Sequence, residues 1–171
     1  MTSPEMKKAT GFIIFFLAAA VFPASSGADS WGPFNLIEAK PLNEVWLNPG
    51  FYSYHFDLDK NLNNNNLGLG AEYRYSTVNS ITAGRFHNSD RQISSYVAWY
   101  WQPLELSSVR LGALLGAING YPRAGNGDWF VMAIPVASYE YKSIGINLTV
   151  VPTIKDTVYG SLTLQLKLKV M

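Results

Sequence analysis

The amino-acid sequence predicts an all-β fold: an eight-stranded antiparallel transmembrane β-barrel with a short N-terminal interfacial segment. From Phe51 onward, apolar and polar residues alternate with a period of two, which is typical of strands rather than helices. Aromatic residues make up 14% of the 171 residues, too many for a disordered chain. After residue 28 no apolar run is long enough for a spanning helix, so contact with a membrane requires a closed sheet.

The composition excludes several classes of function. The 13 basic and 12 acidic residues give a formal net charge of +1, which argues against a nucleic-acid-binding protein. The chain has no cysteine and 2 histidines, so disulfides and thiolate metal sites are excluded and few ligands remain for zinc. We therefore expect one domain that needs no metal and no cofactor.

The N-terminus has the pattern of a secretory signal peptide. Two lysines precede an apolar run over residues 11–22, and small residues at 26–28 provide a cleavage site. The run is about a dozen residues, shorter than the roughly 20 that a transmembrane anchor, the alternative, requires. We predict that residues 1–28 are removed and that the mature chain, residues 29–171, is delivered to the outer membrane.

Two parts are expected in the mature chain. Residues 29–49 contain apolar side chains such as Trp31 and favour a short amphipathic segment at the membrane interface. Pro33 and Pro41 limit the length of any helix there. Residues 50–171 are predicted to form the barrel.

Eight segments have the alternation of a strand, and eight is the smallest number usual for a bacterial outer-membrane barrel. Short connections alternate with longer ones rich in Asn, Gly and charge, as expected for periplasmic turns and external loops. The connection at residues 153–156 is short for an external loop. The predicted strands are residues 51–58, 67–75, 80–87, 93–102, 109–118, 129–139, 144–152 and 158–170.

A soluble β-sandwich or lipocalin-like barrel would have the same alternation, with its apolar face inward. The signal peptide and the aromatic content favour the membrane barrel, in which the polar face lines the interior. Trp99 and Trp101 are expected in an aromatic girdle near the periplasmic end. The polar face carries Glu72, Arg74, Asn147, Thr149, Gln165 and Lys167.

Both histidines are expected at the external rim. His55 lies near the external end of the first strand, and His87-Asn88-Ser89-Asp90 follows the third strand, which also runs outward. A histidine beside a hydroxyl and an amide or carboxylate is what acyl transfer requires. Two plainer alternatives stand beside this hypothesis. The tetrapeptide also suits a polar loop closed by its own side chains, and His55 also suits an interior hydrogen-bonded position.

Two prolines fall at or within strand patterns. Pro135 and Pro152 each remove a ladder donor, and in a closed barrel the resulting gap would let a lipid chain pass sideways from the bilayer into the interior. Alternatively, each proline simply ends a strand.

The chain resembles the lipid A palmitoyltransferases of the PagP type, which are eight-stranded outer-membrane barrels, over residues 46–170. Residues 135–138 through Val151-Pro152 look like the stretch between that family's two gate prolines, with the same spacing. Phe86-His87-Asn88-Ser89 resembles the family's Phe-Lys-Asp-Ser, and Pro49 through Tyr54-His55 resembles its Pro…Trp-His. Met171 stands where a Phe is usual.

The resemblance implies an acyltransferase that moves a palmitoyl chain from a phospholipid donor to a lipid A acceptor. His55 matches the family's catalytic histidine, Ser89 its catalytic serine, and Asn88 stands where the family has aspartate. Either Asn88 or Asp90 would then fill the aspartate's role. Ala98 aligns with the small residue that floors the family's acyl pocket.

The remaining implications concern substrates and partners. The acyl chain would enter between the strands that flank Pro135 and Pro152. Arg91 and Arg123, on external loops, are candidates to meet lipid A phosphates, although loop arginines are often simply solvated. We expect a monomer in the outer-membrane bilayer that binds no nucleic acid.

Two other functions compete with the transferase. A lipid A deacylase of the small-barrel type has a His-x-Ser pairing that His87-Asn88-Ser89 resembles, but it needs a carboxylate on the next strand, and residues 93–102 contain none. A structural or adhesion barrel needs no catalyst. The transferase requires His55, the deacylase requires His87, and the structural barrel requires neither.

Overall fold

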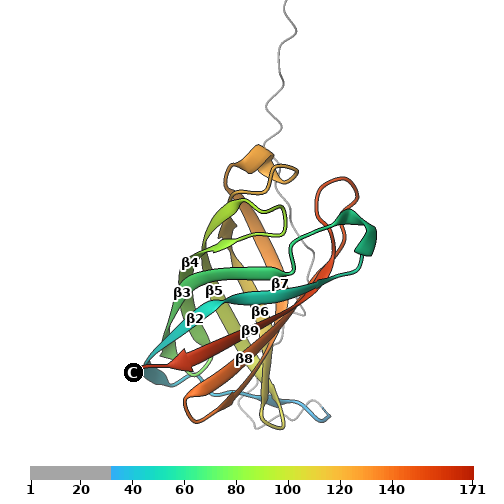
Figure 1. Ribbon diagram of the computed structural model, residues 1–171. Coiled ribbons are helices and arrows are strands. Elements are labelled where there is room, and N and C mark those ends of the chain that lie inside the picture. Colours follow the sequence, from blue (N-terminus) through green and yellow to red (C-terminus); the bar gives the residue numbers. More distant parts are fainter. Residues whose placement is uncertain (1–31) are drawn as a thin grey trace, which may run out of the picture.

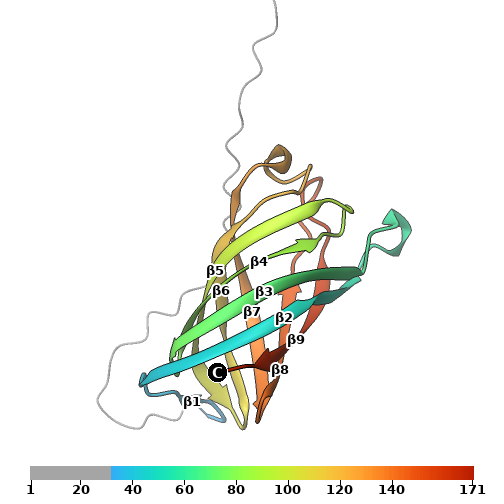
Figure 2. The ribbon, with the colours of Figure 1, turned by 60° about the vertical axis from the view of Figure 1, so that its left-hand side comes forward.

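The computed structural model describes residues 32–171, and these form a closed barrel of eight antiparallel strands (Figures 1 and 2). The predicted all-β fold, an eight-stranded antiparallel barrel, is therefore confirmed, while the predicted signal peptide lies outside the described residues. Two single-turn 3-10 helices, η1 and η2, interrupt the connections. The elements are β1 Asn35–Leu36, β2 Pro41–His55, η1 Leu58–Lys60, β3 Asn65–Ser76, β4 Asn79–His87, β5 Ile93–Leu106, β6 Val109–Ile118, η2 Gly125–Gly127, β7 Phe130–Tyr141, β8 Ile144–Val151 and β9 Ser161–Lys169.

Strands β2 to β9 form the wall. Each pairs with the next, and β2 pairs with β9 to close the barrel. One end carries the long connections, at the top of Figure 1, and we call it the loop end. The opposite turn end carries the tight connections at 77–78, 107–108 and 142–143. β1 pairs with β5 beyond the end of β4, at Leu104 and Glu105.

The observed strands differ from the predicted ones mainly at two places. β2 begins at Pro41, ten residues before the predicted start, so residues 41–49 belong to the barrel wall and not to an interfacial segment. β9 begins at Ser161, so the last loop-end connection runs over residues 152–160 and is not the short one expected. Within residues 32–171, no helix has the length and apolar character needed to cross a membrane.

The apolar face of the wall points outward and the polar face inward, as the membrane-barrel alternative required. Leu67, Leu69 and Leu166 are each more than half exposed, whereas Glu72 and Lys167 are almost fully buried. The soluble-barrel alternative needs the opposite arrangement. Trp99 and Trp101 point outward as expected. Aromatic side chains also face outward towards the turn end at Tyr73, Tyr75, Tyr139 and Tyr141, and towards the loop end at Tyr52, Tyr54, Phe56 and Trp129.

Charged side chains fill the turn-end half of the interior. Lys167 Nζ lies 2.8 Å from Glu72 and 2.9 Å from Glu140, and Arg110 lies 2.8 Å from Glu140. Arg74 bonds both oxygens of Glu140 and also lies 3.1 Å from Glu44. Burying a charge is costly unless it is paired and hydrogen-bonded, and here each of these charges has an opposite partner.

The inward face of β2 changes phase at Gly50. Trp46 and Asn48 point inward before it, and Ser53 and His55 point inward after it, so the alternation shifts from even to odd positions. The register of β2 is irregular there against both β3 and β9. Gly50 has a φ of 103°, and a Cβ on it would lie 2.1 Å from the Asn66 carbonyl oxygen. Without this irregularity, His55 would face outward.

Gly50→Ala is therefore expected to destabilise the barrel strongly. The backbone strain alone costs about 1–3 kcal/mol, and the clash with the Asn66 carbonyl adds to it. The measurement is the midpoint temperature of heat-dependent unfolding, followed by gel migration and by circular dichroism. Gly127→Ala is a matched control, because Gly127 also has a positive φ, 86°, but has no atom within 4 Å of the added Cβ. Equal effects of the two substitutions would contradict the assignment.

Candidate active site

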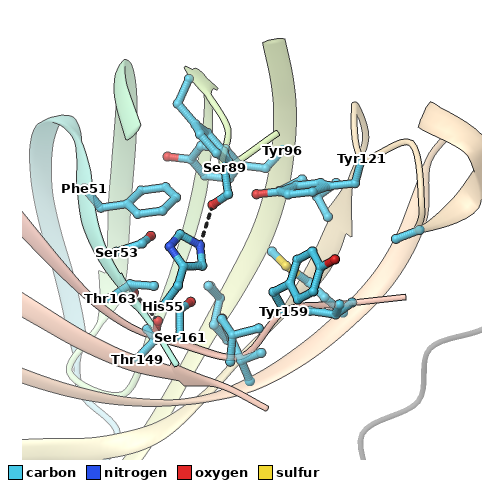
Figure 3. A pocket seen from close by; sticks show the side chains of 18 of the residues that line it. Phe51, Ser53, His55, Ser89, Tyr96, Tyr121, Thr149, Tyr159, Ser161 and Thr163 are labelled. Carbon is cyan, nitrogen blue, oxygen red and sulfur yellow. Dashed lines mark hydrogen bonds between the residues drawn. The ribbon is translucent and has the colours of Figure 1, made fainter. Parts of the chain in front are cut away.

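His55 is the last residue of β2 and lies inside the barrel at the loop end. The phase change at Gly50 turns its side chain inward, where it is 4% exposed. The opposite residue on β9 is Ser161, which is also buried. The imidazole therefore lies in a protected position near the mouth of the barrel (Figure 3).

Both ring nitrogens of His55 are hydrogen-bonded. Nε2 lies 2.9 Å from Ser89 Oγ, and Nδ1 lies 2.8 Å from Asn64 Oδ1 (the Ser89 bond is dashed in Figure 3). An amide oxygen can only accept a hydrogen bond, so Nδ1 carries the ring proton and donates it to Asn64. Nε2 is then the acceptor of a hydrogen bond from the Ser89 hydroxyl. The structure thus brings together the predicted pair His55 and Ser89, and adds Asn64 as a third member. A serine, a histidine and an amide in this order form the arrangement that activates a hydroxyl nucleophile.

Asn88, predicted as the third catalytic residue, lies elsewhere. Its side chain is fully buried, and its Nδ2 donates to Ser94 Oγ at 2.9 Å and to the Gly120 carbonyl at 2.7 Å. Its Oδ1 accepts the backbone N–H groups of Asp90 and Gln92. Every hydrogen-bonding position of the amide is used, so Asn88 holds the 88–92 connection in shape and is not available to His55.

Asp90, the alternative, also fails to take that role. Its carboxylate lies 4.0 Å from Arg123, and among residues 32–171 the side chain bonded to His55 Nδ1 is that of Asn64. The N–H of Asn63 donates to the Ser89 carbonyl at 2.9 Å, and its Nδ2 donates to the Asn88 carbonyl. These bonds join the chain before β3 to the 88–92 connection and bring Asn64 and Ser89 to the same imidazole.

The sequence signal for Asn64 was weak. Asn64 belongs to a run of four asparagines at 63–66, which is typical of a loop, and it was included in the predicted connection 59–66. Asn64 reaches the same imidazole as Ser89 because two connections contact each other in the folded chain. Residue spacing does not reveal such a contact.

A cavity of about 180 Å³ opens beneath the His55 and Ser89 side chains. Most of its wall is apolar. Towards the turn end it is closed by a polar layer in which Asn147 bonds Tyr100 at 3.3 Å and Gln165 at 3.0 Å. Below that layer lie the ion pairs. The apolar lining includes Phe51, Phe86, Tyr96, Leu114, Met132 and Ile134.

Ala98, predicted to floor an acyl pocket, is a buried residue of β5 that does not line the cavity. It packs with Tyr100, Leu114 and Ile134, all three of which line the cavity, but Ala98 is not itself part of the lining. The floor is formed instead by the larger side chains of Tyr100, Asn147 and Gln165.

The wall is incompletely paired between β7 and β8. Between the described residues of these two strands, pairing runs from Tyr141↔Ile144 to Val136↔Thr149 and stops there, although β7 begins at Phe130. Pro135 is the next residue of β7 towards the loop end, and it points outward. Pro152 directly follows β8. Pro135 thus lies within its strand, while Pro152 ends one, and both border the unpaired part of the wall.

The other candidate residues lie around the mouth. Arg123 lines the cavity, with its guanidinium 4.3 Å from the centre of the Tyr159 ring. Arg91 is exposed and donates to Asn61 Oδ1 at 3.2 Å, outside the cavity lining. His87 is exposed on the outer face, so it cannot pair with Ser89 in the manner that the deacylase hypothesis required.

Tyr121 provides a neutral hydroxyl at the mouth. Its ring lines the cavity, and the hydroxyl is directed towards the side where Ser89 lies (Figure 3). Burial, together with the negative charge of Asp90, raises the pKa of the Tyr121 phenol above its ordinary value. The phenol therefore stays protonated and can donate a hydrogen bond to a bound carbonyl.

No protein-family model and no curated protein sequence matches this chain. The chemistry of the site is therefore inferred from its own geometry.

Asn88→Asp, which introduces the residue that the palmitoyltransferases have, is expected to loosen the 88–92 connection. A carboxylate oxygen would replace the Nδ2 donor that lies 2.7 Å from the Gly120 carbonyl, and an unsatisfied buried acceptor costs about 1–3 kcal/mol. Limited proteolysis should detect faster cleavage within this connection. A cleavage rate equal to that of the unmodified protein would return Asn88 to the list of catalytic candidates.

Proposed function

We propose that this protein is an outer-membrane acyltransferase that moves a palmitoyl chain from a phospholipid to lipid A. The observation that carries this proposal is the position of the His55–Ser89 pair at the mouth of an apolar cavity inside a barrel whose outer face is also apolar. A structural barrel has no need of a hydrogen-bonded histidine and serine beside an empty apolar space.

The outer surface supports a position in the membrane. Its aliphatic side chains form a band between aromatic side chains at the two ends, which is the pattern of a transmembrane barrel. In the outer membrane the longer connections are external, so the loop end with His55 would lie at the outer leaflet, where lipid A is found. The turn end would face the periplasm.

The depth of the cavity suits a long acyl chain. On β5, the six steps from Ser94 to Tyr100 rise by about 20 Å along the strand, or about 15 Å along the barrel axis at a tilt of about 40°. Asn88 contacts Ser94 at the level of the site, and Tyr100 belongs to the floor. The apolar lining would solvate most of an extended palmitoyl chain with its ester near Ser89.

The unpaired part of the β7–β8 wall is the proposed entrance for that chain. It borders the cavity on the side where Ile134 and Val151 line it, and Pro135 cannot supply the missing ladder donor. An acyl chain would thus move from one apolar environment into another without crossing the polar rim. The donor would be a phospholipid, and lipid A would approach from the external connections, where Arg123 lies.

In the reaction, His55 acts as the general base and then as the general acid. Its Nε2 takes a hydroxyl proton as the ester carbonyl is attacked, and returns a proton to the leaving oxygen. The neutral Tyr121 phenol is a suitable donor to the developing oxyanion.

The direct test is mass spectrometry of lipid A from cells with and without this protein. We expect lipid A to gain one palmitoyl group when the protein is present, and the gain to disappear with His55→Ala, because general acid–base catalysis contributes about 100-fold or more to the rate. His87→Ala is the matched control, since His87 faces outward and should leave the gain unchanged.

Other outcomes would replace the proposal. Loss of an acyl chain from lipid A would identify a deacylase. No change in lipid A, with the protein folded in the outer membrane, would leave the structural barrel.

The lateral entrance can be tested by closing it with an engineered disulfide. The chain has no cysteine of its own, so two introduced cysteines can pair only with each other. Continuing the observed register by one step pairs Pro135 with Val150, so Pro135→Cys with Val150→Cys should link the two strands when oxidised. We expect lipid A palmitoylation to fall at least tenfold on oxidation and to recover with a reducing agent. The control pair, Ala137→Cys with Leu148→Cys, lies in the paired part of the same seam and should have no effect. Full activity of the oxidised first pair would exclude this route.

A further inference from the structure

The hydrogen bonds of His55 indicate which hydroxyl it deprotonates first. Nε2, the nitrogen that acts as base, is already bonded to Ser89 Oγ at 2.9 Å, and Nδ1 is bonded to Asn64 at 2.8 Å. An acceptor hydroxyl could reach Nε2 only by displacing the Ser89 hydroxyl. The proton that the imidazole is placed to remove is therefore that of Ser89.

We propose that Ser89 is the covalent nucleophile of this protein, so that the reaction passes through an acyl-Ser89 intermediate, and that Asn64 is the positioning residue for His55. This deepens the proposed function and rests on it for the identity of the acyl donor.

The first step forms a bond between Ser89 Oγ and the carbonyl carbon of the donor ester. The Ser89 proton moves to His55 Nε2, and the tetrahedral intermediate collapses by breaking the bond to the ester oxygen. That oxygen takes the proton from His55 and leaves as the hydroxyl of a lysophospholipid. The products of this step are the lysophospholipid and an acyl ester of Ser89.

In the second step an incoming hydroxyl is the nucleophile and the Ser89 oxygen is the leaving group. With the Ser89 oxygen acylated, Nε2 is free to accept a proton from an incoming hydroxyl. A lipid A hydroxyl gives the transferred ester, and water gives a free fatty acid; in both cases the proton passes through His55 to the departing Ser89 oxygen. Ser89 is regenerated in either case.

Asn64 determines the tautomer that makes both steps possible. Its Oδ1 accepts the Nδ1 proton, which leaves the Nε2 lone pair directed at Ser89. The segment before β3 holds this amide in place, because Ser53 donates its N–H to the Asn64 carbonyl at 2.8 Å. Asn64 touches the imidazole and not the reacting ester, so it acts through His55.

The test uses the purified full-length barrel in detergent with a hexadecyl fluorophosphonate, a probe that reacts with activated serines. Attack by Ser89 forms an Oγ–P bond and expels fluoride, and the Ser89 proton leaves through His55. We expect stoichiometric labelling of the peptide that contains Ser89, detected by mass spectrometry. Labelling should be lost in Ser89→Ala, whereas Ser143→Ala, which removes an exposed hydroxyl from the 142–143 turn at the opposite end of the barrel, should label like the unmodified protein.

Two substitutions of Asn64 separate positioning from a merely structural role. Asn64→Leu keeps the volume and removes the acceptor, and it should lower the labelling rate on the order of 100-fold. Asn64→Asp keeps an acceptor oxygen and should restore most of that rate. Heat-dependent gel migration reports whether each variant is folded, and equal labelling by folded Asn64→Leu would overturn the role of Asn64.

The remaining outcomes distinguish this inference from the proposed function. Palmitoylation of lipid A without labelling of Ser89, and without release of fatty acid from phospholipid vesicles, would overturn the acyl-enzyme and leave the transferase. Labelling of Ser89 and release of fatty acid without any gain on lipid A would support the acyl-enzyme and exclude the transferase.

Discussion

The buried ion pairs in the turn-end half of the barrel are the interaction on which the rest of the interior depends. Because the wall faces outward with its apolar side, the inward side chains of this half are polar and must satisfy one another. Glu72, Glu140 and Lys167 do so with short ion pairs, and the Trp46 ring lies 4.7 Å from Lys167 Nζ. A fully paired network tolerates burial, while removing one member would leave a charge without compensation. The network fills the space near the turn end, so the loop-end half is the half in which a cavity remains.

The strand β2 connects these two halves. Its first part places Trp46 against the ion pairs, and its last residue, His55, reaches the candidate site. A regular strand could not do both, since the two positions differ by an odd number of residues and would face opposite sides. The irregularity at Gly50 corrects the phase at the cost of a conformation that other residues rarely adopt. An irregularity in a strand near a candidate site is therefore evidence that the residues beyond it have a role in that site, because regular pairing would be the more stable arrangement.

Most of the fold follows from the period-two alternation, and β6 has the predicted bounds, Val109–Ile118. The start of β2 could not be predicted in the same way, because Pro41 and Pro49 within residues 41–49 argue against a strand and the phase change hides the alternation. His55 and Ser89 were found because strand direction alone places both at one end. The exchange of Asn88 for Asn64 was beyond this reasoning: both are asparagines in connections, and their roles differ only through hydrogen bonds that form between connections in the folded chain.

The site is assembled from three segments, and this arrangement would allow one barrel to support both the proposed transfer and hydrolysis of the acyl-enzyme. β2 fixes His55 in the wall, whereas Asn64 and Ser89 come from two connections joined by the bond between the Asn63 N–H and the Ser89 carbonyl. The base is thus rigid and buried, and the nucleophile faces the mouth. The apolar cavity holds the acyl chain away from water, but an ester on Ser89 would lie where external hydroxyls arrive. Which hydroxyl attacks then depends on occupancy of the mouth: an acceptor bound there excludes water, and an empty mouth admits it. In the proposed reaction, specificity for transfer would therefore be a property of the loop-end connections, and the hydrogen-bonded chain of Ser89, His55 and Asn64 would be common to both outcomes.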